Sequence, residues 1–231
     1  LIATPGRLLD LADRRAVDLS TTRFLVLDEA DRMLDMGFIH ALRRISALLP
    51  RERQTMLFSA TMPKDMEEVS RAYLTDPVRV QVNPPGQAVA KIEQSLHFVA
   101  RAAKTEVLVE LLDAHRDDRA LVFGRTKHGS EKLARQLEQA GFAVAAIHGN
   151  KSQGQRDRAV AAFREGEVRV LVATDVAARG LDIPGVAYVY NYDLPNVPEA
   201  YVHRIGRTAR AGADGIAVAL VAPDEMDDLK A

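Results

Sequence analysis

Residues 24–34, FLVLDEADRML, join an apolar run to three carboxylates within four positions. The composition predicts a buried strand over Arg23–Asp28. Asp28, Glu29 and Asp31 close the run, and carboxylates this near to one another repel at neutral pH. A divalent cation would relieve that repulsion, and Mg²⁺ often binds one or two carboxylates together with phosphate oxygens. The stretch therefore predicts either a magnesium site at a strand end or an acidic first turn of a helix, which the helix dipole also favours.

The composition limits the classes of protein to which the chain can belong. Its 231 residues suffice for one large or two modest domains, and a net charge of −1 means that nucleic acid could bind only through a local patch. The absence of cysteine excludes disulfides and thiolate metal sites and suits the reducing cytoplasm. No apolar run approaches the roughly 18 residues of a membrane span, so we expect no membrane association. Leu1–Ala3 resemble the end of a strand, and we expect the sequence to begin within a domain.

Strand-like and helical segments alternate, which predicts an α/β fold with parallel sheets covered on both faces. Helical spacing occurs in residues 38–50, 104–114 and 129–141. The predicted strands are Leu1–Ala3, Arg23–Asp28, Gln54–Ser59, Pro77–Val82, Arg119–Gly124, Phe142–His148, Val168–Thr174, Val186–Asn191 and Gly215–Val221. Pro84, Pro85 and Gly86 indicate a linker over 83–91 between a first segment, 1–82, and a second, 92–231.

Polar groups follow most of these strands. They are Thr4–Arg7, Asp28–Asp31, Ser59–Thr61, Arg125–Thr126, His148–Gly149 and Thr174–Asp175. Ligands of open α/β sheets bind outside the carboxyl ends of the strands, so the set predicts two ligand-binding surfaces. Ordinary helix capping by Ser, Thr and Asp explains any single group but explains the whole set poorly.

Seven motifs in this order resemble those of the DEAD-box ATP-dependent RNA helicases, and specifically the bacterial RhlE-type branch. They are TPGR (4–7), VLDEADRMLDMGF (26–38), SAT (59–61), LVFGRTK (121–127), HGNKSQGQR (148–156), ATDVAARGLD (173–182) and HRIGRTAR (203–210). The resemblance implies two RecA-like lobes with parallel sheets, the first incomplete at its N-terminus. It also implies RNA-stimulated ATP hydrolysis that drives local RNA unwinding or remodelling of RNA–protein complexes.

The resemblance assigns roles residue by residue. The catalytic residues would be Asp28 and Glu29, which handle Mg²⁺ and the attacking water, and Arg207 and Arg210, which contact the phosphates of ATP. Nucleotide binding and coupling between lobes would fall to Asp31, Ser59, Thr61, Asp182 and His203. The RNA backbone, which carries no sequence information, would be held by Thr4, Gly6, Arg7, Thr126, Gly149, Gln153, Arg156, Thr174 and Arg179.

The arginines can also be interpreted from their spacing. If residues 203–210 are helical, His203, Arg207 and Arg210 lie on one face while Arg204 points elsewhere. A guanidinium group can bind phosphate oxygens in a bidentate manner, whereas isolated arginines usually belong to a solvated basic face. The family commonly has glycine in place of Ala209. Alanine adds one methyl group and favours helix, so we expect function to survive.

No G-x-x-x-x-G-K-[S/T] phosphate loop occurs in the sequence, and residues 149–156 only begin like one. We therefore expect the intact parent protein to be an RNA-stimulated ATPase and the 231-residue piece to be inactive by itself. Three alternatives stay open: an ATP-gated RNA clamp with little unwinding, a DNA helicase of a related superfamily, and a non-enzymatic structural protein. The family implies a cytoplasmic monomer that works with ribosomal or RNA-decay complexes.

Overall fold

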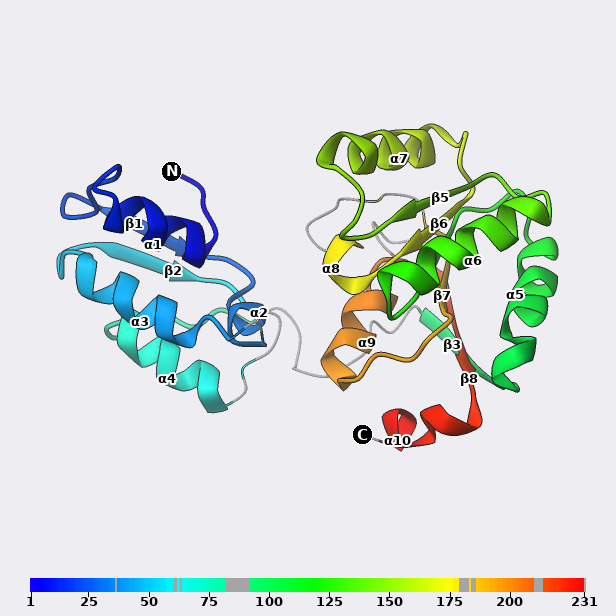
Figure 1. Cartoon of the computed structure of the whole chain (residues 1–231). Helices are drawn as coiled ribbons and strands as arrows, with labels where there is room; N and C mark the ends of the chain where they lie inside the picture. The colour runs from blue at the N-terminus through cyan, green and yellow to red at the C-terminus, as the bar shows by residue number, and fades with distance from the viewer. Residues whose placement is uncertain are drawn as a thin grey trace. The chain divides into compact units, whose positions relative to one another are not determined.

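The computed structural model describes residues 1–35, 37–59, 62, 64–81, 92–178, 183, 186–209 and 214–230, with only the backbone at 35, 64, 65 and 199. The chain divides into two compact units, Leu1–Gln87 and Ala88–Ala231 (Figure 1). Each unit has its own parallel sheet. The predicted linker, 83–91, lies outside the described residues.

The first unit is built on two parallel strands, β1 (Phe24–Leu27) and β2 (Gln54–Leu57). Its helices are α1 (Pro5–Asp13), α2 (Ala30–Asp35), α3 (Ile39–Leu48) and α4 (Lys64–Tyr73). Leu27 packs against Leu42 of α3 and Met66 of α4 on one face of the sheet. Phe24 and Val26 are exposed on the other face, because side chains of a strand alternate between faces. Helices therefore cover one face only of the described sheet.

Two strand predictions for this unit are wrong. Leu1–Ala3 and Pro77–Gln81 form no strand, and Val82 lies outside the described residues. Val78 and Val80 have the alternating pattern of a strand, yet they are 91% and 85% exposed. A strand exists only where a neighbouring strand satisfies its backbone hydrogen bonds, and in the described part of the chain no strand lies beside either segment. Pro5 instead begins helix α1, a position where its fixed φ is favourable.

The second unit holds a six-stranded parallel sheet in the order β3-β8-β7-β4-β6-β5. Its strands are β3 (Ile92–Phe98), β4 (Ala120–Phe123), β5 (Val144–Ile147), β6 (Val170–Ala173), β7 (Tyr188–Asn191) and β8 (Gly215–Val221). Each strand predicted in this unit is confirmed, with small differences at the ends. Strand β3 was missed, because an edge strand that pairs only with β8 leaves much of its surface exposed and carries a weak apolar signal.

Helices cover both faces of this second sheet (Figure 1). Val122 and Val172 pack with α5 (Lys104–Asp113) and α6 (Lys127–Gln139). Leu121 and Leu171, on the opposite face, pack with α7 (Gln153–Glu165) and α8 (Asp175–Ala178). The remaining elements are α9 (Pro198–Ile205), α10 (Met226–Lys230) and two short 3₁₀ turns, η1 (Arg101–Ala103) and η3 (Pro223–Glu225). No helix in the described part of the chain combines the length and apolar character needed to cross a membrane.

An ion-pair cluster fixes the loop that follows β5. Glu131 of α6 places Oε2 2.9 Å from Lys151 Nζ and 2.8 Å from His148 Nε2. Lys151 first and His148 second lower the pKa of Glu131 from 4.5 to about 2. The carboxylate therefore holds the buried His148 and the loop after it against helix α6.

The connection after α9 contains a left-handed residue. Helix α9 ends at Ile205, so residues 203–209 are not one helix. Thr208 Oγ1 donates to Val186 O at 2.6 Å, and Ala209 then has a φ of +54°. L-residues rarely adopt this conformation, whereas glycine does so freely. Helix propensity therefore has no bearing on position 209, because this position is not helical, and the survival of function with alanine stays a prediction.

Glu131→Gln should make the stability of the second unit less dependent on pH in the acid range. Because the pKa of Glu131 is lower in the folded than in the unfolded state, its stabilising contribution is present above about pH 4.5 and is lost as the pH falls toward 2. The variant should melt a few degrees lower than the wild type at pH 7, and this difference should shrink between pH 4.5 and 2.5, as measured by circular dichroism. The matched control is Glu138→Gln, an exposed glutamate of the same helix; an equal effect there would contradict the assignment.

Ala209→Gly should stabilise unit 2 by about 1 kcal/mol, because glycine removes the cost of the left-handed backbone. Ala200→Gly, inside helix α9, is the matched control and should destabilise by about 1 kcal/mol. Urea unfolding of the two variants measures both changes. A loss of stability in Ala209→Gly would show that the turn carries no strain.

Candidate functional site

Two carboxylates lie at the carboxyl end of β1. Asp28 and Glu29 follow the last residue of the strand, and both are exposed. Asp28 Oδ1 accepts a hydrogen bond from Glu29 N at 2.9 Å, and Glu29 has a φ of +50°. This tight, left-handed turn keeps both carboxylates at the surface at the start of α2. The predicted pair is therefore brought together at a strand end.

The ends of β1 and β2 are tied to each other through Asp31. Its backbone N–H donates to Ser59 Oγ at 3.1 Å, and Ala30 N donates to Phe58 O at 3.0 Å. Asp31 is buried in the first turn of α2. The backbone of Asp31 thus meets the side chain of Ser59, while the coupling role predicted for these residues stays a prediction and Thr61 lies outside the described residues.

Asp28 and Glu29 offer the oxygen donors that Mg²⁺ prefers. Within the described ranges, no group of three or more His, Cys, Asp or Glu side chains could hold a metal ion. Mg²⁺ usually keeps several waters and binds through one or two carboxylates together with substrate phosphates. The two carboxylates therefore fit an ion that is shared with a phosphate ligand.

Thr4, Gly6 and Arg7 surround the N-terminus of helix α1. Thr4 is the N-cap residue in an extended conformation, and its side chain makes no capping hydrogen bond. Arg7 is exposed and pairs with Asp10 at 3.0 Å. The free N–H groups and positive end of a helix of this length favour an anion such as a phosphate. The geometry is compatible with the predicted phosphate contact.

In the second unit, Gly124 and Thr126 follow strand β4, and Gly149 lies in the loop after strand β5. Thr126 caps α6, since its Oγ1 accepts from Gly129 N at 3.0 Å. A Cβ on Gly124 would lie 2.6 Å from Ser130 Oγ, so a larger residue here would have to displace that hydroxyl group. At Gly149, by contrast, a Cβ would meet nothing within 4 Å among the described residues. Thr126 thus has a structural role whether or not it also binds a ligand.

Gln153 and Arg156 lie together in the first turns of α7. Arg156 Nη1 donates to Gln153 Oε1 at 3.3 Å and Nη2 donates to Ala177 O at 3.0 Å. Helix α8, which contains Ala177, directly follows Thr174. Arg156 therefore positions the segment after β6, and the RNA contact predicted for it stays a prediction.

Arg204 is the residue of this region that sequence reasoning missed. It is 2% exposed, and its guanidinium binds both carboxylate oxygens of Asp175 at 2.6 and 2.8 Å. It also donates to Asn191 Oδ1 at 3.1 Å and to Asp193 O at 2.6 Å. A buried charge is tolerated only with such partners. The signal in the sequence was Asp175, an acid placed directly after a buried strand.

His203 and Arg207 lie beside Arg204. With Phe123 and Asp175 they line a small hollow at the carboxyl ends of β4 and β6. His203 Nε2 is buried and has no hydrogen-bond partner among the described residues. Because α9 ends at Ile205, the helical face predicted for His203, Arg207 and Arg210 does not form. Arg179, Asp182 and Arg210 lie outside the described residues.

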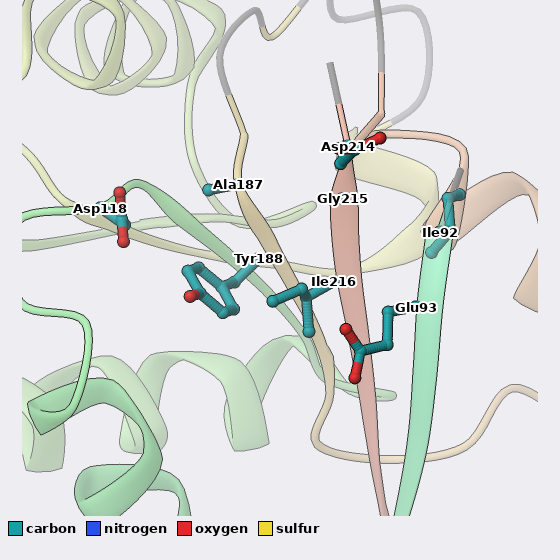
Figure 2. Close-up of a pocket in the computed structure, with 8 residues that line it drawn as sticks. All are labelled: Ile92, Glu93, Asp118, Ala187, Tyr188, Asp214, Gly215 and Ile216. Atoms are coloured by element: carbon teal, nitrogen blue, oxygen red, sulfur yellow. The ribbon is translucent and has the colours of Figure 1, made fainter. Parts of the chain in front are cut away.

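A larger hollow of about 650 Å³ lies at the opposite edge of this sheet, at the amino ends of β3, β7 and β8 (Figure 2). Glu93, Asp118 and Asp214 are among its lining residues. Three carboxylates would repel phosphate. The candidate site for an anionic ligand is therefore at the carboxyl ends of the strands.

Both units are similar to known protein families. Residues 1–69 match the DEAD/DEAH box helicase family model, and residues 103–212 match the helicase conserved C-terminal domain. The chain is 46% identical over 231 residues to the DEAD-box ATP-dependent RNA helicase CshA of Bacillus subtilis, covering 100% of this chain and 47% of that protein. It thus spans about half the length of the curated relatives that it matches.

Solved structures agree with these matches. Yeast (S. cerevisiae) Dbp5 bound to RNA and ADP BeF3 superimposes with a TM-score of 0.86 and 34% identity, over 99% of this chain and 61% of that one. E. coli DEAD-box protein SrmB bound to regulator of ribonuclease activity A gives a TM-score of 0.59 and 43% identity, over 62% of this chain and 84% of that one.

The RhlE-type branch expected from the sequence is not supported, because the similar curated relatives carry the name CshA. The family itself is supported by both domain models and by relatives of known structure. The α/β units with parallel sheets are those of RecA-like DEAD-box structures. The chain belongs to the DEAD-box RNA helicase family.

Proposed function

We propose that the protein carrying this chain is an ATP-dependent RNA helicase, in which RNA stimulates ATP hydrolysis and hydrolysis drives local unwinding of RNA or remodelling of RNA–protein complexes. The proposal rests on one observation above all. Asp28, Glu29 and Asp31 follow strand β1, and the backbone N–H of Asp31 donates to the hydroxyl of Ser59 beyond strand β2. Acidic strand ends linked in this way suit a nucleotide phosphate and its metal ion.

We assign residues 1–82 to the first helicase lobe, residues 83–91 to a linker and residues 92–231 to the second lobe. The Dbp5 structure, which is similar over 99% of this chain, contains RNA and ADP BeF3. This supports ATP and RNA as the ligands of the present protein. The chain supplies acidic groups from its first unit and arginines from its second.

In the proposed mechanism, Asp28 would hold Mg²⁺, directly or through water, and Glu29 would orient the attacking water. When bound, Mg²⁺ neutralises charge on the phosphates. Asp28 already accepts from Glu29 N through one oxygen, which keeps the carboxylates in a defined turn. Arg207 and Arg210 stabilise the charge that develops on the transferred phosphoryl group. Asp182 accepts a hydrogen bond from the ribose, and Thr61 and His203 join Asp31 and Ser59 in coupling hydrolysis to lobe closure.

RNA would be held through its phosphates. Thr4, Gly6 and Arg7 would contribute from the N-terminus of α1 in the first unit, where free N–H groups favour anions. The corresponding residues of the second unit are Thr126, Gly149, Gln153, Arg156, Thr174 and Arg179. Contacts of this kind position the strand without reading its sequence. They also explain how a chain with a net charge of −1 can bind RNA.

The relatives favour a CshA-type protein over the RhlE-type branch. We further propose that it acts as a monomer in the cytoplasm and assists ribosomal or RNA-decay complexes. SrmB, which is 43% identical over the part that it shares with this chain, is solved with a regulator of ribonuclease activity, which supports a connection to RNA decay.

The function is tested by ATP hydrolysis with the longest polypeptide of the reading frame. Hydrolysis should rise on addition of single-stranded RNA and should respond far less to DNA of the same sequence, because a 2′-hydroxyl contact distinguishes them. A short RNA duplex should unwind only with ATP. ATP-dependent RNA binding without unwinding would favour the clamp instead. Residues 1–231 alone should show no RNA-stimulated hydrolysis, since they contain no phosphate loop.

Arg207→Ala should lower kcat by about 10³-fold or more, because an arginine at a transferring phosphoryl group contributes about 10³–10⁵ in rate. The affinity for nucleotide should fall much less, since the contact strengthens in the transition state. Arg135→Ala, an exposed arginine of α6 in the same unit, is the control and should change neither quantity. Equal losses in kcat and in affinity for Arg207→Ala would disprove this role.

A further inference from the structure

We propose that Arg32 is a positioning residue for Glu29, whose carboxylate it holds in the orientation needed to direct the attacking water. The inference rests on the proposed function, because that function gives Glu29 its catalytic task. It adds a residue to which neither the motif resemblance nor the comparisons assign a role. Arg32 lies one turn after Glu29, at the start of helix α2.

The contact itself is short and direct. Arg32 Nη1 donates to Glu29 Oε2 at 2.7 Å. The charge-assisted bond binds one of the two carboxylate oxygens and leaves Oε1 for another partner. An arginine that fixes one oxygen in this way also restricts rotation of the whole carboxylate group.

Arg32 differs from the other paired arginines of the first unit in its burial. Its side chain is 20% exposed, whereas Arg71, paired with Glu67 at 3.4 Å, is 80% exposed. Ion pairs between exposed side chains contribute little, because both partners remain mobile and solvated. The side chain of Arg32 is instead largely covered by protein, although that of Glu29 is 50% exposed, so the position of the guanidinium is set by packing as well as by charge.

A polar atom left without a partner supports the same conclusion. Arg32 Nε is buried, and the described residues offer it no hydrogen-bond acceptor. Burying a donor without an acceptor is unfavourable. An arginine that only formed a surface ion pair within the helix would expose its Nε–H to water. In the observed position, Nε is buried away from water, while Nη1 keeps its hydrogen bond to Glu29.

The backbone removes the remaining freedom of Glu29. Its φ of +50° and the bond from its N–H to Asp28 Oδ1 fix the main chain. The N–H of Arg32 in turn donates to Asp31 Oδ1 at 3.0 Å, in the same helical turn. The side-chain torsions of Glu29 stay adjustable, and the Arg32 contact restricts them. Misplacement of a catalytic group by about 1 Å can cost about 10²-fold in rate.

The test compares Arg32→Met and Arg32→Lys in the longest polypeptide of the reading frame, with Arg71→Met as the matched control. Arg32→Met should lower the kcat of RNA-stimulated ATP hydrolysis by about 10- to 100-fold. The KM values for ATP and RNA, the Kd for a fluorescent ATP analogue and the thermal midpoint should stay close to those of the wild type. Lysine should restore part of kcat, because it keeps the charge but not the planar fork. Arg71→Met should behave as the wild type.

A double-mutant cycle shows whether Arg32 acts through Glu29. Adding Arg32→Met to Glu29→Gln should change kcat by no more than about twofold, since the target of the positioning is already lost. Full additivity of the two substitutions would overturn the inference. An unchanged kcat in Arg32→Met would overturn it as well. So would a variant in which kcat, nucleotide affinity and the thermal midpoint all fall together and lysine restores none of them. A wild-type polypeptide without RNA-stimulated hydrolysis would instead overturn the proposed function, and this inference with it.

Discussion

Parallel hydrogen bonding between strands is the constraint on which the rest of the structure depends. Every strand of both sheets runs in the same direction as its neighbours, so all carboxyl ends reach one edge of their sheet. Residues far apart in sequence, such as Asp31 and Ser59, meet there without any special arrangement of the loops. The acidic and arginine side chains to which we assign chemistry lie near these carboxyl ends, while the acidic hollow at the amino ends of the second sheet is unsuited to phosphate.

A buried arginine holds together the segments at the carboxyl ends of the strands in the second unit. Arg204 is almost fully buried, and its guanidinium donates hydrogen bonds to Asp175, to Asn191 and to the carbonyl of Asp193. Removing any one partner would leave a buried charge partly unmatched, which is costly in a medium of low polarity. The segments after β6 and β7 and helix α9 are thereby held as one piece. His203 lies beside Arg204 in α9, and Arg207 follows the end of that helix, so both are placed near this buried group.

Among the described residues, four that are not glycine have a positive φ, and two of them, Glu29 and Ala209, are or lie near residues to which we assign chemistry. Glu29 and Ala209 both occupy the left-handed region, where a side chain is unfavourable and glycine is the usual occupant. Glu29 begins the turn that presents two carboxylates, and Ala209 lies two residues after Arg207. In both places the surrounding contacts enforce a conformation that local preference would reject. Helix propensity is therefore no guide at position 209, which follows the end of α9.

The sequence by itself determined the α/β class, the strands of the second sheet except β3, and the carboxylates at the end of β1, because apolar runs and polar strand ends are local patterns. The tertiary structure alone decided that Pro77–Gln81 is no strand, that β3 is one, and that Arg204 is a buried centre of hydrogen bonds. The physical reason is the same in each case. A strand needs a neighbour to take its backbone hydrogen bonds, and an arginine can be buried only where acceptors from distant segments converge on it.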